Sequence, residues 1–129
     1  MCHGMTVLLF LIGLSSASSG TPQVQHSRSV GAASWYGEAH RGKLMANGRK
    51  FDPNKLTAAS WFYPLGAKVR VVRHSPGHSP RSVTVTITDR GPAWDLVQDG
   101  RIIDLSQGAF RRLGNPDAGL VPVLVQRVQ

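Results

Sequence analysis

The residues most able to do chemistry lie where a predicted strand ends. Residues 83–88 alternate strictly between apolar side chains and threonine, which is the period-two pattern of a half-buried strand. Asp89 and Arg90 follow directly, and Gly91 and Pro92 form a turn behind them. Because loops at the ends of strands often carry function, Asp89 is a candidate catalytic carboxylate. The plainer alternative is that Asp89 only caps the turn and pairs with Arg90.

The elements that position this carboxylate are short strands separated by turn residues. Residues 37–54, rich in Gly, Asn, Lys and Arg, predict a long surface loop, and loops of that length in small domains are often functional. A short helix is expected after Ser106, its N-cap, with Gly114 at its end. Together these elements predict a mainly β fold, a small closed or nearly closed barrel with one or two short helices. The predicted strands are residues 32–36, 56–59, 68–73, 83–88, 101–105 and 121–128.

The first twenty residues have the features of a targeting segment. They contain no Lys, Arg, Asp or Glu, and residues 6–14 form an apolar run too short to span a bilayer. Small residues follow, as at a signal cleavage site. We therefore expect a signal peptide at residues 1–20, a disordered lead-in at 21–29 and one domain at 30–129. The mature protein is expected to be exported, in the periplasm or secreted and associated with the cell wall.

The cysteine content narrows the chemistry. The only cysteine, Cys2, precedes the apolar run, whereas a lipid-anchoring cysteine would follow it. We therefore expect no lipid anchor, no disulfide and no thiol nucleophile in the mature domain. Nothing in the sequence indicates an oligomer, and a monomer is expected.

The net charge of +8 suits anionic surfaces such as wall polymers. Nucleic acid is the usual alternative for such a charge, but the arginines are spread singly apart from Arg111 and Arg112, so no nucleic-acid binding is expected. His74 and His78 are four residues apart across a Pro-Gly turn, with no carboxylate near them in the sequence. This spacing does not favour a metal site, and we expect neither a metal nor a cofactor.

Several short motifs occur in a characteristic order. They are GAASWYG at residues 31–37, ANG at 46–48, LTAA at 56–59, PLG at 64–66, the segment 83–92, and GRIIDLS at 100–106. In this order and spacing the chain resembles the rare lipoprotein A (RlpA) family, from about Gly31 to the C-terminus. The resemblance implies a six-stranded double-psi β-barrel, the fold shared with expansins and with another class of lytic transglycosylase.

The resemblance also implies an activity, endolytic peptidoglycan lytic transglycosylation. Such enzymes cleave the bond between N-acetylmuramic acid and N-acetylglucosamine and leave 1,6-anhydro ends on the glycan strand. The nucleophile is the 6-hydroxyl of the substrate, so one protein acid/base can suffice, and Asp89 matches the essential aspartate of the family. The alternative is a non-catalytic, expansin-like module that binds peptidoglycan glycan during wall remodelling.

Two positions depart from the family pattern. Where relatives commonly carry a glutamate and a histidine that assist the aspartate, this chain has Arg49 and Ser60. Both are expected on the wall of the groove, so that restoring the two family residues would raise activity. Glu38, the only glutamate in the chain, is a candidate substitute for the missing carboxylate.

The remaining expected site residues are aromatic or polar. Trp35, Tyr36 and Trp61 are candidates for stacking on sugar rings, although large aromatics also fill the cores of small domains. Asp104, between two apolar residues of a predicted strand, has either a structural or a substrate-binding role. The full set expected to bind the glycan strand is Tyr36, Gly37, Asn47, Arg49, Ser60, Trp61, Arg90 and Asp104.

Overall fold

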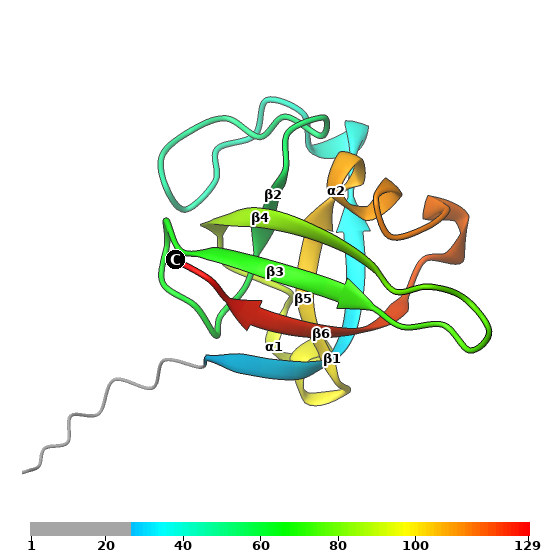
Figure 1. Cartoon of the computed structure of the whole chain (residues 1–129). Coiled ribbons are helices and arrows are strands. Elements are labelled where there is room, and N and C mark those ends of the chain that lie inside the picture. Colours follow the sequence, from blue (N-terminus) through cyan, green and yellow to red (C-terminus); the bar gives the residue numbers. More distant parts are fainter. Residues whose placement is uncertain (1–26) are drawn as a thin grey trace, which may run out of the picture.

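The computed structural model describes residues 27–129 (Figure 1). The predicted signal peptide, residues 1–20, and residues 21–26 of the predicted lead-in lie outside the described residues. Within residues 27–129, no helix is both long enough and apolar enough to cross a membrane.

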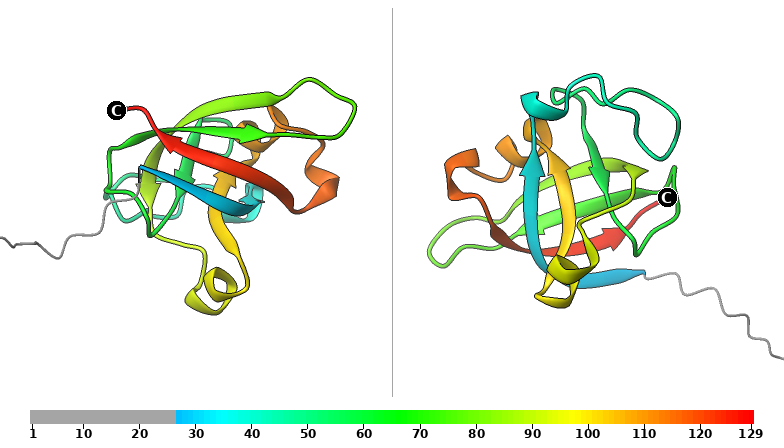
Figure 2. Two further views of the ribbon diagram at one scale, coloured as in Figure 1. Left: turned by 60° about the horizontal axis from the view of Figure 1, so that its bottom comes forward. Right: turned by 180° about the vertical axis from the view of Figure 1, so that it is seen from behind.

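Six strands close into a barrel in the order β1-β5-β2-β4-β3-β6 (Figures 1 and 2). The pairs β1–β5 and β2–β4 are parallel, and the other four pairs are antiparallel. The mainly β barrel predicted from the sequence is confirmed. The strands are β1 (Arg28–Tyr36), β2 (Thr57–Ala59), β3 (Lys68–Arg73), β4 (Arg81–Asp89), β5 (Arg101–Ser106) and β6 (Val121–Arg127).

The predicted strands are all present, and the largest difference is at the start of β1. This strand begins at Arg28, four residues before the predicted strand, because residues 28–31 pair with β6. Arg28 and Ser29, which the sequence assigned to the lead-in, therefore belong to the barrel. The sequence gave no sign of this pairing because residues 27–31 do not alternate between apolar and polar types.

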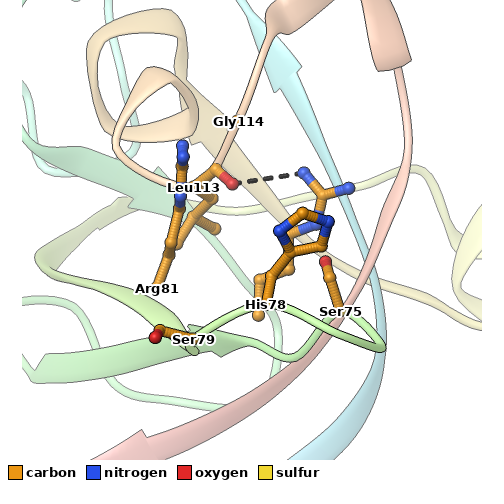
Figure 3. A pocket seen from close by; sticks show the side chains of 7 residues that line it. Ser75, His78, Ser79, Arg81, Leu113 and Gly114 are labelled. Atoms are coloured by element: carbon orange, nitrogen blue, oxygen red, sulfur yellow. Dashed lines mark hydrogen bonds between the residues drawn. The ribbon is translucent and has the colours of Figure 1, made fainter.

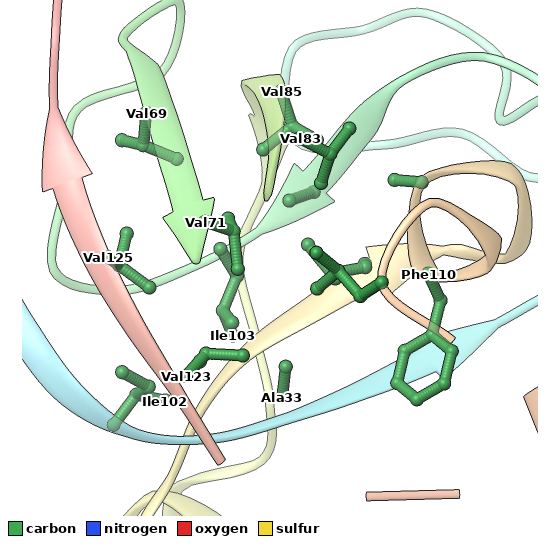
Figure 4. Packing of buried hydrophobic residues seen from close by; sticks show 14 of the residues in the cluster. Ala33, Val69, Val71, Val83, Val85, Ile102, Ile103, Phe110, Val123 and Val125 are labelled. Carbon is green, nitrogen blue, oxygen red and sulfur yellow. The ribbon is translucent and has the colours of Figure 1, made fainter. Parts of the chain in front are cut away.

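The core follows from the period-two pattern of the strands. In β4, Val83, Val85 and Ile87 are buried while Thr84 is exposed, as successive side chains of a strand point to opposite faces. Valines of β3 and β6, Ile103 and Leu105 of β5, and Phe110 meet them inside the barrel (Figure 4). These β-branched and aliphatic side chains stabilise the fold by removing apolar surface from water.

Four short helices complete the structure, of which one was predicted. The predicted helix is α2 (Gln107–Arg111), and the hydroxyl of Ser106 caps it by accepting from the Ala109 backbone N–H. Helix α1 (Trp94–Gln98) was not predicted, because five residues are too few to show a helical period. The other two are 3₁₀ turns, η2 (Glu38–His40) and η3 (Pro116–Ala118).

The long loop between β1 and β2 is fastened to helix α2. The Gly108 backbone N–H donates to the Pro53 carbonyl at 2.8 Å, and the Ser106 hydroxyl donates to the Lys55 carbonyl at 2.5 Å. A Cβ on Gly108 would lie only 3.0–3.1 Å from the carbonyl oxygens of Asn54 and Pro53, so the absence of a side chain permits this approach. In Figure 1 the loop covers one end of the barrel beside α2.

Replacing Ser106 by alanine tests this fastening. Ser106→Ala removes the cap of α2 and one of the two hydrogen bonds to the Lys55 carbonyl, which keeps the Thr57 N–H as a donor. We therefore expect a loss of about 1–3 kcal/mol in the free energy of unfolding. Urea denaturation followed by circular dichroism measures the loss. Ser79→Ala, at an exposed serine, is the control, and equal stabilities of the two variants would contradict the account.

Candidate active site

Strand pairing places two aspartates on one row across the barrel. Asp89 of β4 lies opposite Ala59 of β2, Ala59 lies opposite Asp104 of β5, and Asp104 lies opposite Ser34 of β1. Residues opposite one another point to the same face of a sheet. Because Ile103 points into the core, this row faces outward. The small side chain of Ala59 leaves space between the two carboxylates, whose strands are about 10 Å apart.

Backbone groups of the long loop hold Asp89 in one orientation. Its Oδ1 atom accepts from the Ala46 N–H and from the Arg90 N–H, both at 2.9 Å. The Asn47 N–H donates to the Thr88 carbonyl at 3.1 Å, which keeps the loop against the end of β4. Within residues 27–129, no hydrogen bond reaches Oδ2 of Asp89, so this oxygen is free to bind or protonate a ligand.

Asp104 is a partly buried carboxyl group. Burial raises its pKa above the ordinary value of 3.8, while a hydrogen bond from the Ser34 hydroxyl and the positive charges of Arg101 and His40 act in the opposite direction. The charge of Asp89 raises the pKa further. Asp104 therefore holds its proton more readily than an exposed aspartate does, a property useful in a proton donor.

A cavity of about 290 Å³ opens over this row of residues. Tyr36 is half-buried at the end of β1, and its buried hydroxyl has no hydrogen-bond partner among the described residues. Burial, and then the charges of Asp89 and Asp104, raise the pKa of Tyr36, so the buried hydroxyl remains protonated. The cavity is lined by Ser34, Trp35, Tyr36, His40, Ala59, Asp89, Arg90, Arg101 and Asp104.

His40 is the last residue of the turn η2 and lines the cavity. Its backbone N–H donates to the Gly37 carbonyl at 2.9 Å, and its imidazole meets the Tyr36 ring edge-on at 5.5 Å. Phe51 stacks on Tyr36 at 4.3 Å, so the ring of Tyr36 is packed between protein side chains and is not free to stack on a sugar. Sequence reasoning missed His40, because its position depends on a turn with no periodic pattern.

Arg90 has a different set of partners from those of the plainer sequence interpretation. Its guanidinium donates to the carbonyls of Ser60 and Tyr63 at 2.7 and 2.6 Å. No ion pair joins Arg90 to Asp89 in the part of the chain that the structure describes. The alternative in which the two side chains pair is therefore wrong, because two backbone carbonyls already occupy the guanidinium and fasten the loop after β2 to the end of β4. Arg90 nevertheless lines the cavity.

The two positions that depart from the family pattern lie in unlike environments. Arg49 is exposed and is not among the residues that line the cavity. Ser60 is fully buried, and its hydroxyl accepts from the Phe62 N–H at 3.0 Å. The prediction that Ser60 lies on the groove wall is wrong. Ser60 directly follows Ala59, the last residue of β2, and its N–H donates to the Asp89 carbonyl at 3.1 Å. Because successive side chains of an extended chain alternate, its hydroxyl points away from the row that carries Ala59.

Gly37 and Asn47 shape the turns beside the cavity, Gly37 through its carbonyl and Asn47 through its side chain. Gly37 is buried and holds His40 through its carbonyl, as described above. Asn47 is exposed, and its Oδ1 accepts from the Arg49 N–H at 2.9 Å, which shapes the turn that presents Ala46 to Asp89. Neither residue is among those that line the cavity.

Two tryptophans form an exposed pair near the cavity. The rings of Trp61 and Trp94 stack with centroids 5.2 Å apart and an interplanar angle of 15°, and they are 41% and 57% exposed. The indole N–H of Trp61 donates to the Pro92 carbonyl at 2.7 Å. Trp61 was expected at the site, but Trp94 was not, because its pairing depends on helix α1. Trp35 instead packs against Phe110 of the core.

Comparison with known proteins gives the family. The family model for lytic transglycolase matches residues 28–125. Over 99 residues the chain is 43% identical to a Synechocystis protein named probable endolytic peptidoglycan transglycosylase RlpA, covering 77% of this chain and 29% of that protein. A Pseudomonas aeruginosa protein named endolytic peptidoglycan transglycosylase RlpA is 40% identical over 101 residues, covering 78% and 28%. This chain belongs to the RlpA family of lytic transglycosylases, and it spans less than a third of the length of these relatives.

Solved structures show the same fold. The Streptomyces papain inhibitor superposes with a TM-score of 0.59 at 26% identity, covering 79% of this chain and 94% of that chain. An expansin of Clavibacter michiganensis, solved with cellohexaose, gives a TM-score of 0.56 at 19% identity, covering 79% and 50%. The barrel is thus the double-psi barrel that the sequence resemblance implied.

The described residues offer no cluster of metal-binding side chains. Between residues 27 and 129, no group of three His, Cys, Asp or Glu side chains is arranged to hold a metal ion.

The raised pKa of Asp104 predicts how stability depends on pH. The folded protein binds this proton more tightly than the unfolded chain does, so ionisation of Asp104 costs stability as the pH rises above about 4. Asp104→Asn removes this cost and keeps an acceptor for the Ser34 hydroxyl. We therefore expect the melting temperature of the variant, relative to the parent protein, to be higher at about pH 7 than at about pH 3.

Thermal unfolding at the two pH values checks this expectation. Asp99→Asn, at an exposed aspartate, controls for the loss of one negative charge from a basic protein. A relative melting temperature of Asp104→Asn that falls between low and neutral pH would contradict the assignment.

Proposed function

We propose that this domain cleaves peptidoglycan glycan strands as an endolytic lytic transglycosylase, with Asp89 as its acid/base. The observation that carries the proposal is the row on which Asp89 and Asp104 flank Ala59 beneath a cavity of about 290 Å³. Membership of the RlpA family supports the same reaction. Such a substrate requires export, and the apolar run at residues 6–14 supports export.

The proposed reaction needs one group that moves a proton twice. Asp89 protonates the oxygen of the leaving sugar and later accepts the proton of the muramic acid 6-hydroxyl as it attacks the anomeric carbon. The two N–H donors on Oδ1 fix the carboxylate so that Oδ2 meets the glycosidic oxygen. Hydrolysis of a glycoside generally requires a second carboxylate to activate water, whereas this reaction does not.

The other polar groups of the cavity orient the sugar. The Asp104 carboxyl group, on the same row as Asp89, offers oxygen atoms for hydrogen bonds to the sugar, and Tyr36 lines the cavity beside it. His40 brings an imidazole to the cavity from the loop, in place of the family histidine whose position here is the buried Ser60. The proposed site thus retains a histidine, although a different strand end supplies it.

Substitution of Asp89 tests the proposal. The purified domain should release 1,6-anhydro products from glycan strands stripped of their stem peptides, and Asp89→Asn should lower the rate roughly a hundredfold or more. Mass spectrometry of the soluble fragments measures both rates. His40→Gln should lower the rate less, because the acid/base remains.

The control is Asp52→Asn, at a loop aspartate outside the cavity. If Asp89→Asn retains the activity of this control, Asp89 is not the acid/base.

A second candidate function is binding of the glycan without turnover. The observation that favours it is the replacement of both family helper residues, with Arg49 exposed and outside the cavity lining and Ser60 fully buried. In this case insoluble peptidoglycan would retain the domain, no anhydro product would form, and Asp89→Asn would bind as well as the parent protein.

Both candidate functions give a role to the Trp61–Trp94 pair. Trp61 follows Ala59 by two residues, and Trp94 follows Arg90 by four. An exposed indole face offers a surface on which an apolar sugar face stacks. Trp94→Ala should therefore weaken retention on insoluble peptidoglycan by about 0.5–1.5 kcal/mol, roughly two- to tenfold. Leu120→Ala, at another exposed apolar side chain, is the control, and equal retention of the two variants would exclude this role.

A further inference from the structure

A second cavity, of about 220 Å³, lies at the other end of strand β4. Arg81 is the first residue of β4 and Asp89 the last, so this cavity is roughly 25 Å from the candidate active site. Its lining shares no residue with that site. The residues that line it are Arg73, Ser75, His78, Ser79, Arg81, Leu113 and Gly114 (Figure 3).

The lining is rich in donors and cations and contains no carboxylate. All seven acidic residues of the protein lie in the described residues and none of them lines this cavity. Arg73 and Arg81 are directly opposite each other in the β3–β4 pair, an arrangement in which like charges repel. Neither arginine forms an ion pair within residues 27–129. An anion between them would turn this repulsion into attraction.

Arg73 is held so that part of its guanidinium remains unused. One terminal nitrogen donates to the Leu113 carbonyl at 3.1 Å, while the buried Nε has no partner in the described part of the chain. A Cβ on Gly114 would lie 2.2 Å from the same terminal nitrogen. Gly114 therefore makes room for the guanidinium, and a side chain there would displace it.

The donors converge from different directions. In Figure 3, His78 and Arg81 point from the β3–β4 hairpin toward the segment of Leu113 and Gly114, against which Arg73 is bound. The Ser75 hydroxyl lies on the same side of the hairpin. A planar carboxylate is satisfied by one guanidinium fork, whereas donors from several directions suit a tetrahedral oxyanion.

We propose that this cavity binds a phosphate group, between Arg73 and Arg81 and beneath the 113–114 segment. The group can belong to free phosphate or to the phosphodiester of a polymer, since both present anionic oxygens on a tetrahedral phosphorus.

Titration of the uniformly labelled protein, followed by NMR, tests the site. The probes are inorganic phosphate, dimethyl phosphate and acetate, each at constant ionic strength. Phosphate should shift the backbone amide signals of the 75–79 hairpin in a saturable way, and Arg81→Gln should weaken this binding at least tenfold. Gly114→Ala should weaken it as well, because it displaces the Arg73 guanidinium. Dimethyl phosphate binding as tightly as phosphate indicates a polymer diester, and weaker binding indicates the free ion or a monoester.

Arg70→Gln is the matched control. Arg70 is an exposed arginine of the same strand as Arg73, outside the cavity, with Ser82 as its hydrogen-bond partner. The dissociation constant of the Arg70→Gln variant for phosphate should lie within about twofold of that of the parent protein. If Arg70→Gln loses as much phosphate binding as Arg81→Gln does, the binding depends on overall surface charge and not on this cavity, and the proposal is wrong. Acetate binding as tightly as phosphate, or no saturable shift with phosphate, would also overturn the proposal.

Discussion

The functional part of this molecule depends on the pairing of strand β2 with two neighbours at once. Ala59 lies opposite Asp89 on one side and Asp104 on the other. Because side chains alternate with a period of two, a slip of one residue would turn either carboxylate into the core. The closed barrel prevents this slip, since its buried valines and leucines fill only one face of each strand. Barrel closure therefore sets both the spacing and the direction of the two acids.

The long loop between β1 and β2 satisfies its own backbone and shapes the site with the same contacts. Irregular segments need partners for their N–H and C=O groups, and here the partners are Ser106 and Gly108 on one side and Thr88 and Asp89 on the other. A loop without these contacts would leave the carboxylate of Asp89 free to rotate. The same hydrogen bonds therefore order the loop and orient the carboxylate of Asp89.

Positive charge predominates at both ends of the barrel. The loop at residues 37–54 has two acids, Glu38 and Asp52, against four Lys or Arg residues, and residues 68–88 have four Lys or Arg residues and no acid. In the cavity, Arg90 and Arg101 accompany the two aspartates. With a net charge of +8, the protein is therefore attracted to an anionic surface from more than one side.

The sequence by itself determined the strands and helix α2. The alternation of residues 83–88 and the helix cap at Ser106 are local patterns, and both are present in the fold. Its motifs also identified the family and the aspartate at the end of β4. Only the tertiary structure placed His40 in the cavity, buried Ser60 and stacked Trp94 on Trp61. These positions depend on contacts between loops and strands far apart in the chain, and no periodicity records which side of a loop will face a neighbour.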